Sequence, residues 1–153
     1  MAPALPTFRL MPKPDPALLD PARYPFSCTI EPRFGDLDIN LHINNVAIAG
    51  LLEDGRVRFH RASGYRDALT GLSSMIASIA IEYLGEGHYP DPVTIHSAVE
   101  DTGRSSHRLV QLLMQEKRVV AFARSVMVIV GKAGPAPPPA SFADQIDQWR
   151  LRP

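Results

Sequence analysis

The stretch Phe34-Gly-Asp-Leu-Asp-Ile-Asn-Leu-His-Ile-Asn-Asn45 holds two carboxylates, one histidine and three carboxamides. Its polar residues are separated by single aliphatic ones, Leu37, Ile39, Leu41 and Ile43, a regularity that a solvated loop does not need. We therefore expect the polar groups to lie on a partly buried surface. There, a carboxylate and an imidazole can take part in acid-base or nucleophilic chemistry.

Regular structure is predicted on both sides of this stretch. Residues 26–34 have the pattern of a strand, and from Val46 the apolar residues recur at helical spacing until about Gly64. Asn45 or Asn44 is the expected N-cap of this helix. The free backbone amides of a helix start, together with the helix dipole, suit an anion or a developing oxyanion. Gly50 and Gly55 are unfavourable inside a helix, so we expect another backbone to pass close to them.

Length and composition limit the classes of function. A chain of 153 residues is expected to form one domain, and 16 basic against 16 acidic residues give no electrostatic case for nucleic acid or an anionic membrane as partner. Neither a signal peptide nor an apolar run long enough to span a membrane is evident, and Cys28 has no cysteine partner. We expect a cytoplasmic protein. The histidines and Cys28 lack the spacing of a metal site, so no metal is predicted.

The distribution of prolines divides the chain into three parts. We expect a Pro-rich N-terminal arm over residues 1–23, a folded body over 24–132, and a spacer with a C-terminal amphipathic helix over 133–153. In this last helix Ser141 and Asp144 resemble a capping box, and we expect it to pack on its own protein rather than on a partner. The apolar residues expected to fix the two arms are Leu5, Phe8, Leu10, Leu18, Leu19, Phe142, Ile146 and Trp149.

Four further strands are predicted after the helix, over residues 74–84, 93–101, 107–115 and 119–130. The short connections between the last three favour hairpins, so the pattern is that of an α+β protein with an antiparallel sheet packed on one helix. The last strand is apolar on both faces in its second half, and one helix cannot cover such a sheet. We therefore expect a homodimer or a homotetramer.

The run from Arg33 to Asn45, followed by Leu51-Leu-Glu-Asp-Gly-Arg56, resembles the hotdog-fold thioesterases of the 4-hydroxybenzoyl-CoA and acyl-ACP type. In that family an Asp-x-Asp-x-x-x-His-x-Asn-Asn segment leads from the first strand into a central helix. The resemblance covers about residues 24–130. It implies a five-stranded antiparallel sheet wrapped around one long central helix, and hydrolysis of an acyl-CoA or acyl-ACP thioester at a subunit interface. No cofactor is implied, apart from coenzyme A as part of the substrate.

The resemblance also assigns site residues. Asp38 matches the catalytic carboxylate, which acts as nucleophile or as general base. Asn40 and His42 match residues that position water and polarise the carbonyl, and Glu53 matches an acidic helix residue with a supporting or general-base role. Arg104, Ser105 and Ser106 are residue types that can contact the phosphates of coenzyme A. The expected substrate-binding residues are Asn45, Val46, Arg104, Ser105 and Ser106.

Several of these residues also have a purely structural interpretation. Asp36 is expected to accept hydrogen bonds from loop amides, and the His42 side chain could bond to Asp36 or Asp38. Glu53 could form an ion pair with Arg56 on the helix, and residues 104–106 could form an ordinary exposed turn.

Two other functions remain open at the level of the sequence. One is a hotdog hydratase or dehydratase, although Leu41 replaces the proline that follows the asparagine in their motif. The other is a non-catalytic acyl-CoA-binding or assembly protein.

Overall fold

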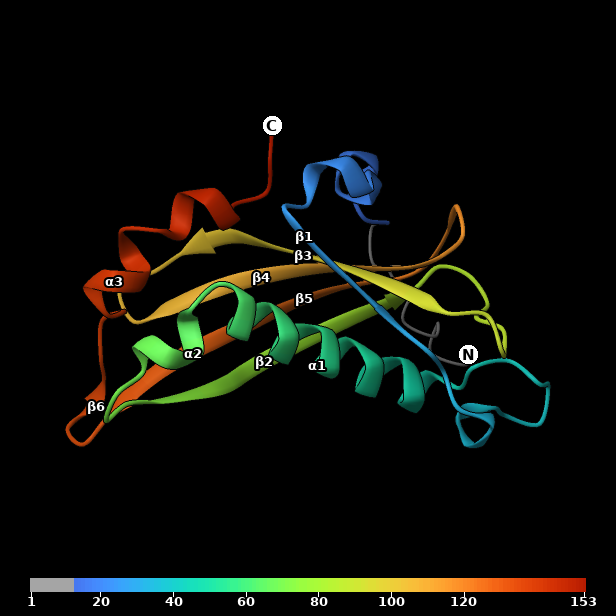
Figure 1. The fold of residues 1–153 in the computed structure, drawn as a ribbon, viewed down its shortest axis with the longest axis horizontal. Helices are drawn as coiled ribbons and strands as arrows, with labels where there is room; N and C mark the ends of the chain where they lie inside the picture. Colours follow the sequence, from blue (N-terminus) through green and yellow to red (C-terminus); the bar gives the residue numbers. More distant parts are fainter. Residues whose placement is uncertain (1–12) are drawn as a thin grey trace, which may run out of the picture.

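The computed structural model describes residues 13–153, which form a curled antiparallel sheet around one long helix (Figure 1). The long strands are β1 (Phe26–Ile30), β2 (Ser73–Tyr83), β3 (Val93–Thr102), β4 (Ser106–Gln115) and β5 (Arg118–Gly131). Their order across the sheet is β1-β3-β4-β5-β2, and the two-residue β6 (Gly134–Pro135) pairs with β5. The long helix is α1 (Asn45–Ala62), followed by the single-turn α2 (Tyr65–Ala68). The predicted hotdog fold is confirmed.

The first strand is shorter than the sequence suggested. It ends at Ile30, and residues Phe34–Asp36 form a 3-10 turn instead of continuing the strand. Pro32 has no amide to donate to a neighbouring strand, and the amide of Arg33 donates to Asp36 Oδ2 over 2.7 Å. The chain therefore leaves the sheet early and turns toward the start of α1.

Helix α1 buries one face against the sheet, and a glycine in that face permits close packing. A Cβ atom on Gly55 would lie 2.7 Å from Cγ2 of Ile95 on β3, which is too close for any larger residue without movement of Ile95. The expectation of a nearby backbone was thus wrong for Gly55, because the neighbour is a side chain. It was also wrong for Gly50, where a Cβ atom would meet nothing within 4 Å.

Two apolar clusters lie along α1, one near each half of the helix. The proximal cluster is built around the wholly buried Leu52, Val93 and Ile95. The distal cluster contains Phe59 and Tyr65 and is closed by the C-terminal segment. Its buried members are Phe59, Tyr65, Val99, Leu109, Ile129, Phe142 and Ile146. Burial of these side chains is the main stabilising term for the arrangement of helix and sheet.

The C-terminal segment packs back on its own chain, as predicted, but it is not one helix. It consists of the single turn α3 (Ala140–Ala143) and a 3-10 turn over Ile146–Trp149. The predicted capping box is absent, because the N-cap is Pro139 and no side chain caps the turn. The segment is held instead by burial of Phe142 and Ile146 in the distal cluster.

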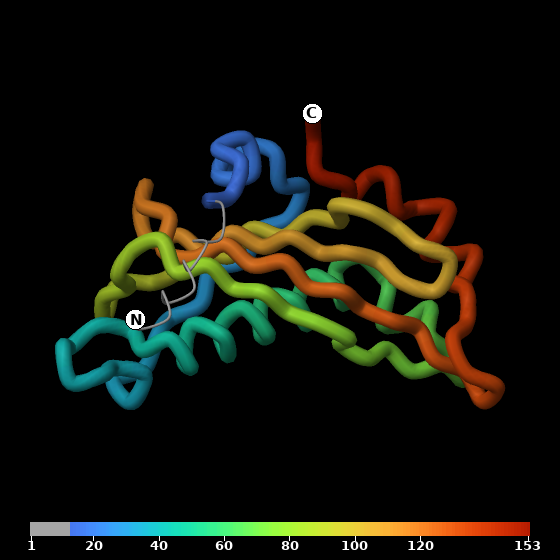
Figure 2. Tube along the Cα trace, turned by 180° about the vertical axis from the view of Figure 1, so that it is seen from behind, coloured from blue at the N-terminus to red at the C-terminus, as the bar shows by residue number. Residues whose placement is uncertain are grey.

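The N-terminal turns over residues 16–23 and the C-terminal segment both lie on the side of the sheet near β1 and β3, away from β2 (Figures 1 and 2). Leu18 and Leu19 pack against a cluster that includes Phe122 of β5, so these two contacts of the arm are confirmed. Leu5, Phe8 and Leu10 lie outside the described residues. Tyr24 donates a hydrogen bond of 2.6 Å to the carbonyl of Leu18.

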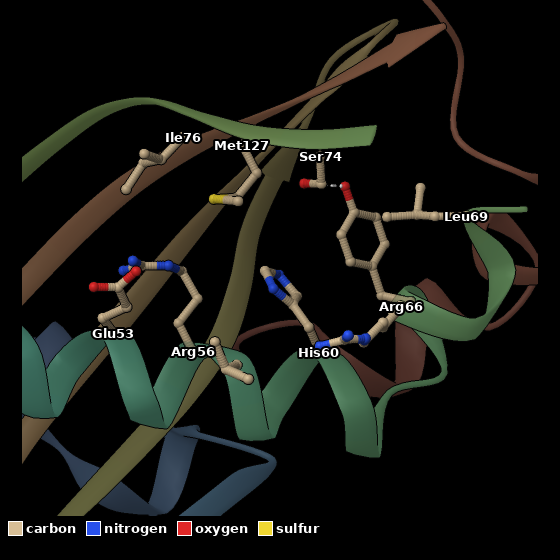
Figure 3. A pocket seen from close by; sticks show the side chains of 10 residues that line it. Glu53, Arg56, His60, Arg66, Leu69, Ser74, Ile76 and Met127 are labelled. Atoms are coloured by element: carbon tan, nitrogen blue, oxygen red, sulfur yellow. Dashed lines mark hydrogen bonds between the residues drawn. The ribbon is translucent and has the colours of Figure 1, made fainter. Parts of the chain in front are cut away.

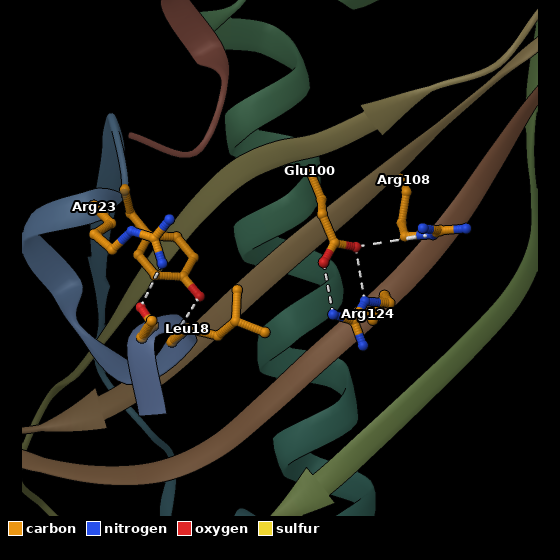
Figure 4. A network of polar contacts seen from close by, with 7 residues as sticks. Leu18, Arg23, Glu100, Arg108 and Arg124 are labelled. Atoms are coloured by element: carbon orange, nitrogen blue, oxygen red, sulfur yellow. Dashed lines mark hydrogen bonds and ion pairs between the residues drawn. The ribbon is translucent and has the colours of Figure 1, made fainter. Parts of the chain in front are cut away.

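A polar network lies close to the N-terminal segment that contains Leu18 and Arg23 (Figure 4). Arg124 of β5 donates two hydrogen bonds of 2.7 and 2.6 Å to the carboxylate of Glu100 on β3, and Arg108 lies 3.8 Å from the same group. The arms therefore cover part of the sheet that was expected to need a partner subunit.

Exposed apolar side chains lie around the start of α1, at Phe34, Ile39, Leu41 and Val46, and also on β2. This strand is at the end of the sheet, it pairs only with β5, and most of its residues are exposed. Its exposed apolar side chains are Met75, Ile76, Ile79 and Tyr83. Helix α1 packs mainly on β1, β3 and β4 and makes fewer contacts with β2.

Candidate functional site

The Asp38 loop is a tight hairpin between the paired residues Leu37 and Ile43. The amide of Asp38 donates to the carbonyl of His42 over 2.8 Å, and Leu41 adopts a left-handed conformation with φ of 62°. Asp38 Oδ1 accepts hydrogen bonds from the amides of Asn40 at 2.8 Å and His42 at 3.1 Å. No hydrogen bond to Oδ2 occurs within residues 13–153. The loop thus holds the carboxylate through one oxygen.

Asp36 has a different role. Its side chain is 10% exposed and accepts a hydrogen bond from the amide of Arg33, and Arg33 Nη2 lies 3.3 Å from Oδ1. Its carbonyl accepts hydrogen bonds of 2.8 Å from both the amide and the side chain of Asn44. Asp36 therefore ties the exit of β1 to the start of α1, as its structural interpretation predicted.

Asn44, and not Asn45, is the N-cap of α1. Its Oδ1 accepts a hydrogen bond of 2.7 Å from the amide of Ala47. The amides of Asn45 and Val46 form no hydrogen bond to any of the described residues. Both residues are exposed and line a hollow of about 860 Å³ together with Asp36 and Gly50. Two backbone donors at the positive end of a helix dipole therefore face this hollow.

The loop between β2 and β3 also reaches the site, a contact that sequence spacing does not reveal. Glu86 Oε2 lies 3.4 Å from His42 Nε2, and the ring of His88 packs edge-on against His42 with 5.3 Å between centroids. The buried Gln115 holds this loop by donating to the carbonyls of His88 at 2.6 Å and Asp91 at 2.8 Å. The His42 side chain is therefore oriented by Glu86 and His88, whereas only its backbone bonds to Asp38.

Other predicted site residues lie elsewhere within one chain. The side chain of Asn40 is exposed in the hairpin. Glu53 lies two turns down α1, about 12 Å along the helix axis from Asn45. Arg104 and Ser105 belong to the connection between β3 and β4, and Ser106 begins β4, at the end of the sheet opposite the Asp38 loop (Figure 1). A single chain therefore brings together Asp38, His42 and the start of α1, but not Glu53 or residues 104–106.

A second cavity, of about 330 Å³, lies between the distal half of α1, the short helix α2 and the strands β2 and β5 (Figure 3). We call it the Arg56 cavity. Glu53 is at its wall, and the ion pair expected between Glu53 and Arg56 is not formed. Its lining residues are Glu53, Arg56, Val57, His60, Tyr65, Arg66, Leu69, Ser74, Ile76 and Met127.

Behind this cavity two histidines are packed together. His60 Nε2 lies 3.2 Å from His107 Nε2 of β4. Burial lowers the pKa of His60 to about 3, with the neighbouring His107 and Arg56 as further causes. Burial also lowers the pKa of His107 to about 4. Both imidazoles are therefore neutral near pH 7, and one donates to the other.

Comparison with protein families identifies the family of this chain. Residues 32–146 match the model of the thioesterase-like superfamily, and the chain belongs to this family. The prediction of a thioesterase-class enzyme with the hotdog fold is thereby confirmed at the level of the family.

Solved structures agree with this fold. A thioesterase of Thermus thermophilus complexed with coenzyme A and zinc shares 25% identity with a TM-score of 0.72, covering 86% of this chain and 98% of the other. A hypothetical protein of Staphylococcus aureus in complex with CoA shares 20% identity with a TM-score of 0.75, covering 84% and 85%. The probable thioesterase YbaW of Escherichia coli shares 23% identity with a TM-score of 0.71, covering 80% and 97%.

Among curated proteins no relative was found. Residues 13–153 contain no group of three or more His, Cys, Asp or Glu side chains that could hold a metal ion. Within the same residues, no helix has the length and apolar character that crossing a membrane requires.

Proposed function

We propose that this protein hydrolyses acyl-CoA thioesters to a free acid and coenzyme A, with Asp38 as the catalytic carboxylate. The observation that carries this proposal is that Asp38, bonded through Oδ1 alone, lies in a hairpin that leads directly into α1, where the amides of Asn45 and Val46 form no hydrogen bond within residues 13–153. The family and the neighbours bound to coenzyme A support the choice of substrate.

Thioester hydrolysis needs a nucleophile and donors for the carbonyl oxygen. Asp38 either attacks the carbonyl carbon, giving a mixed anhydride that water then hydrolyses, or removes a proton from the attacking water. In both cases the carbon-sulfur bond breaks, the thiolate leaves and takes up a proton, and one water molecule is consumed. The amides of Asn45 and Val46 would stabilise the oxyanion.

His42 and Asn40 would assist this step. The imidazole of His42 is fixed by Glu86 and His88, so it can hold a water molecule close to the carboxylate. Asn40 lies in the same hairpin, and its exposed amide can donate to the substrate carbonyl. The carboxylate supplies most of the rate in this scheme, and these two residues orient its partners.

We further propose that the active unit is a homodimer formed by antiparallel pairing of two β2 edges. An exposed strand edge with apolar side chains is a template for such pairing. The start of α1 lies near the end of β2, because Tyr83 Oη donates to the carbonyl of Asn45 over 3.1 Å. Antiparallel pairing would therefore bring the Asp38 loop of one chain toward the first half of β2 in the other.

The proposed dimer gives a role to Glu53 and residues 104–106, which lie far from Asp38 within one chain. The β3–β4 connection lies at the end of the molecule that would approach the partner's Asp38 loop (Figure 1). Glu53 and residues 104–106 would then contribute to the site across the interface, with Arg104 on a phosphate of coenzyme A. A homotetramer would be formed by association of two such dimers.

The activity is tested by release of free thiol from a panel of acyl-CoA thioesters of graded length, including one aromatic member. Asp38→Asn retains the Oδ1 acceptor and should lower kcat/KM by at least about a hundredfold, since an activated group of this kind contributes on that scale. Asp147→Asn, on the exposed C-terminal segment, serves as the matched control and should leave the rate unchanged. Wild-type rates in Asp38→Asn would refute the assignment of Asp38.

The carrier and the assembly are tested separately. Acyl-pantetheine thioesters should be hydrolysed with a raised KM if the nucleotide of coenzyme A is bound, whereas equal values would favour an acyl-ACP substrate. Tight acyl-CoA binding without turnover would point to a binding protein instead. Ile79→Lys, at a β2 side chain that is 43% exposed, should yield monomers in light scattering and lose activity. An unchanged dimer mass would exclude the β2 interface.

A further inference from the structure

Arg56 is a buried cation that forms no hydrogen bond or ion pair within residues 13–153. The residue is 7% exposed, and its Nη1 atom is inaccessible and has no hydrogen-bond partner within residues 13–153. Its side chain extends from α1 into the Arg56 cavity, and its guanidinium ends on the side of Glu53 (Figure 3). A buried guanidinium is costly unless it is paired, so an unpaired one facing a cavity points to a ligand.

The charge of the cavity wall is positive. Arg56 and Arg66 contribute two positive charges and Glu53 one negative charge, so the lining carries a net charge of one positive unit while His60 is neutral. Burial lowers the pKa of Arg56, and the nearby charge of Glu53 offsets this only in part. The two side chains form no ion pair, and Arg56 Nη1 keeps no hydrogen-bond partner within residues 13–153. An anionic group is therefore the complement that this wall lacks.

The remaining wall is largely apolar. Val57, Leu69, Ile76 and Met127 contribute aliphatic surface, while the hydroxyl of Tyr65 already donates to Ser74 over 2.9 Å. A volume of about 330 Å³ is at the lower end of small-molecule pockets, which suits a short acyl group better than a nucleotide. An aliphatic chain that ends in a planar anion matches both the surface and the forked guanidinium.

We infer that the Arg56 cavity is the acyl subsite and that Arg56 selects acyl groups whose far end carries a carboxylate. This inference rests on the proposed function. Arg56 lies about 16 Å along the helix axis from Asn45, too far for a short acyl chain attacked at the Asp38 loop of the same subunit. Ser74 and Ile76, at the start of β2, line the cavity, so β2 pairing would present it to Asp38 of the partner subunit.

The test compares acyl groups that differ only at the far end. Adipyl-CoA and hexanoyl-CoA have the same six-carbon chain, ending in a carboxylate or a methyl group, and the comparison is extended to shorter and longer pairs. We expect the wild-type enzyme to prefer the carboxylated member of the best pair by about tenfold to a hundredfold in kcat/KM, the range of a charge-assisted hydrogen bond. Arg56→Met should abolish this preference by slowing hydrolysis of the carboxylated member.

Arg66→Met is the matched control. Arg66 lines the same cavity but is exposed, so its removal should change the preference by less than about threefold. Equal rates for both members in the wild type, or an equal fall for both in Arg56→Met, would overturn the inference while leaving the thioesterase proposal intact. Arg56→Met removes an unpaired buried charge, so we expect it to fold.

Binding of the free acid separates the two proposals. Adipate, more than hexanoate, should raise the Tm of the wild-type protein by binding the folded state, and Arg56→Met should remove the difference. If no thioester is hydrolysed, the proposed function fails, and an Arg56-dependent effect of adipate still identifies the anion subsite. If adipate and hexanoate act alike, the subsite is refuted whatever the activity.

Discussion

The two ends of α1 differ in the hydrogen-bond partners of their polar side chains. At the N-terminal end, Asp36, Asp38 and Asn44 are bonded to backbone groups of the same short stretch. At the distal end, Arg56 is unpaired and the paired histidines come from α1 and β4, which are far apart in the sequence.

This difference in hydrogen bonding indicates that the N-terminal end of α1 positions reacting groups, whereas the distal end recognises a ligand. In the N-terminal stretch most polar atoms stabilise a loop, and the atoms left over are Asp38 Oδ2 and the first amides of α1. In the distal cavity the group without a partner among residues 13–153 is the guanidinium of Arg56, in a wall that is largely apolar. The first arrangement suits chemistry at a fixed point, and the second suits selection of a ligand.

The largest expected effect concerns the distal end and its dependence on pH. In the unfolded chain both histidines titrate near pH 6.5, whereas in the folded protein the pKa is about 3 for His60 and about 4 for His107. Between these values the unfolded state binds more protons. The free energy of unfolding should therefore fall on acidification below about pH 6.5, by at most about 1.4 kcal/mol per pH unit for each imidazole.

Urea unfolding between pH 7 and 4.5 measures this fall. In the double variant His60→Leu and His107→Leu, the free energy of unfolding should fall less per pH unit than in the wild type. All other titrating groups contribute equally in the two proteins. An identical slope in the two proteins would mean that the histidine pair is not a source of acid sensitivity, and the contrast between the two ends would lose its electrostatic part.

An intermediate effect distinguishes the two aspartates of the N-terminal stretch. Asp36→Ala leaves the amide of Arg33 without its buried acceptor and should lower the free energy of unfolding by about 1–3 kcal/mol. Asp38→Asn should change it by less than about 0.5 kcal/mol, since the Oδ1 acceptor is retained and the residue is half-buried. Equal losses of stability would remove the distinction between a structural and a reactive carboxylate.

The smallest effect sharpens the description of the helix start. Asn44→Ala should cost about 0.5–2 kcal/mol in thermal or urea unfolding, because Ala47 loses its capping acceptor. Asn45→Ala should be nearly neutral for stability, since alanine suits the first turn of a helix and the residue is exposed. The opposite order would place the cap at Asn45.

Much of the fold could be predicted because its signals are local. The strand and helix periods identified the sheet and α1 to within a few residues, and the family motif identified the hotdog arrangement. The failures occurred where tertiary contacts decide. The end of β1 depends on a turn held by Asp36. The C-terminal segment forms two short turns instead of the predicted helix, because Phe142 and Ile146 are buried in the distal cluster.

The candidate site divides in the same way. The sequence alone determined that Asp38, His42 and the start of α1 lie together, because twelve consecutive residues form a hairpin that runs into a helix cap. Only the tertiary structure brought Glu86 and His88 to His42 and left Arg56 unpaired in a cavity between α1 and β2. The physical reason is that local hydrogen bonds follow from spacing, whereas the partners of a buried charge depend on which distant strands and helices pack around it.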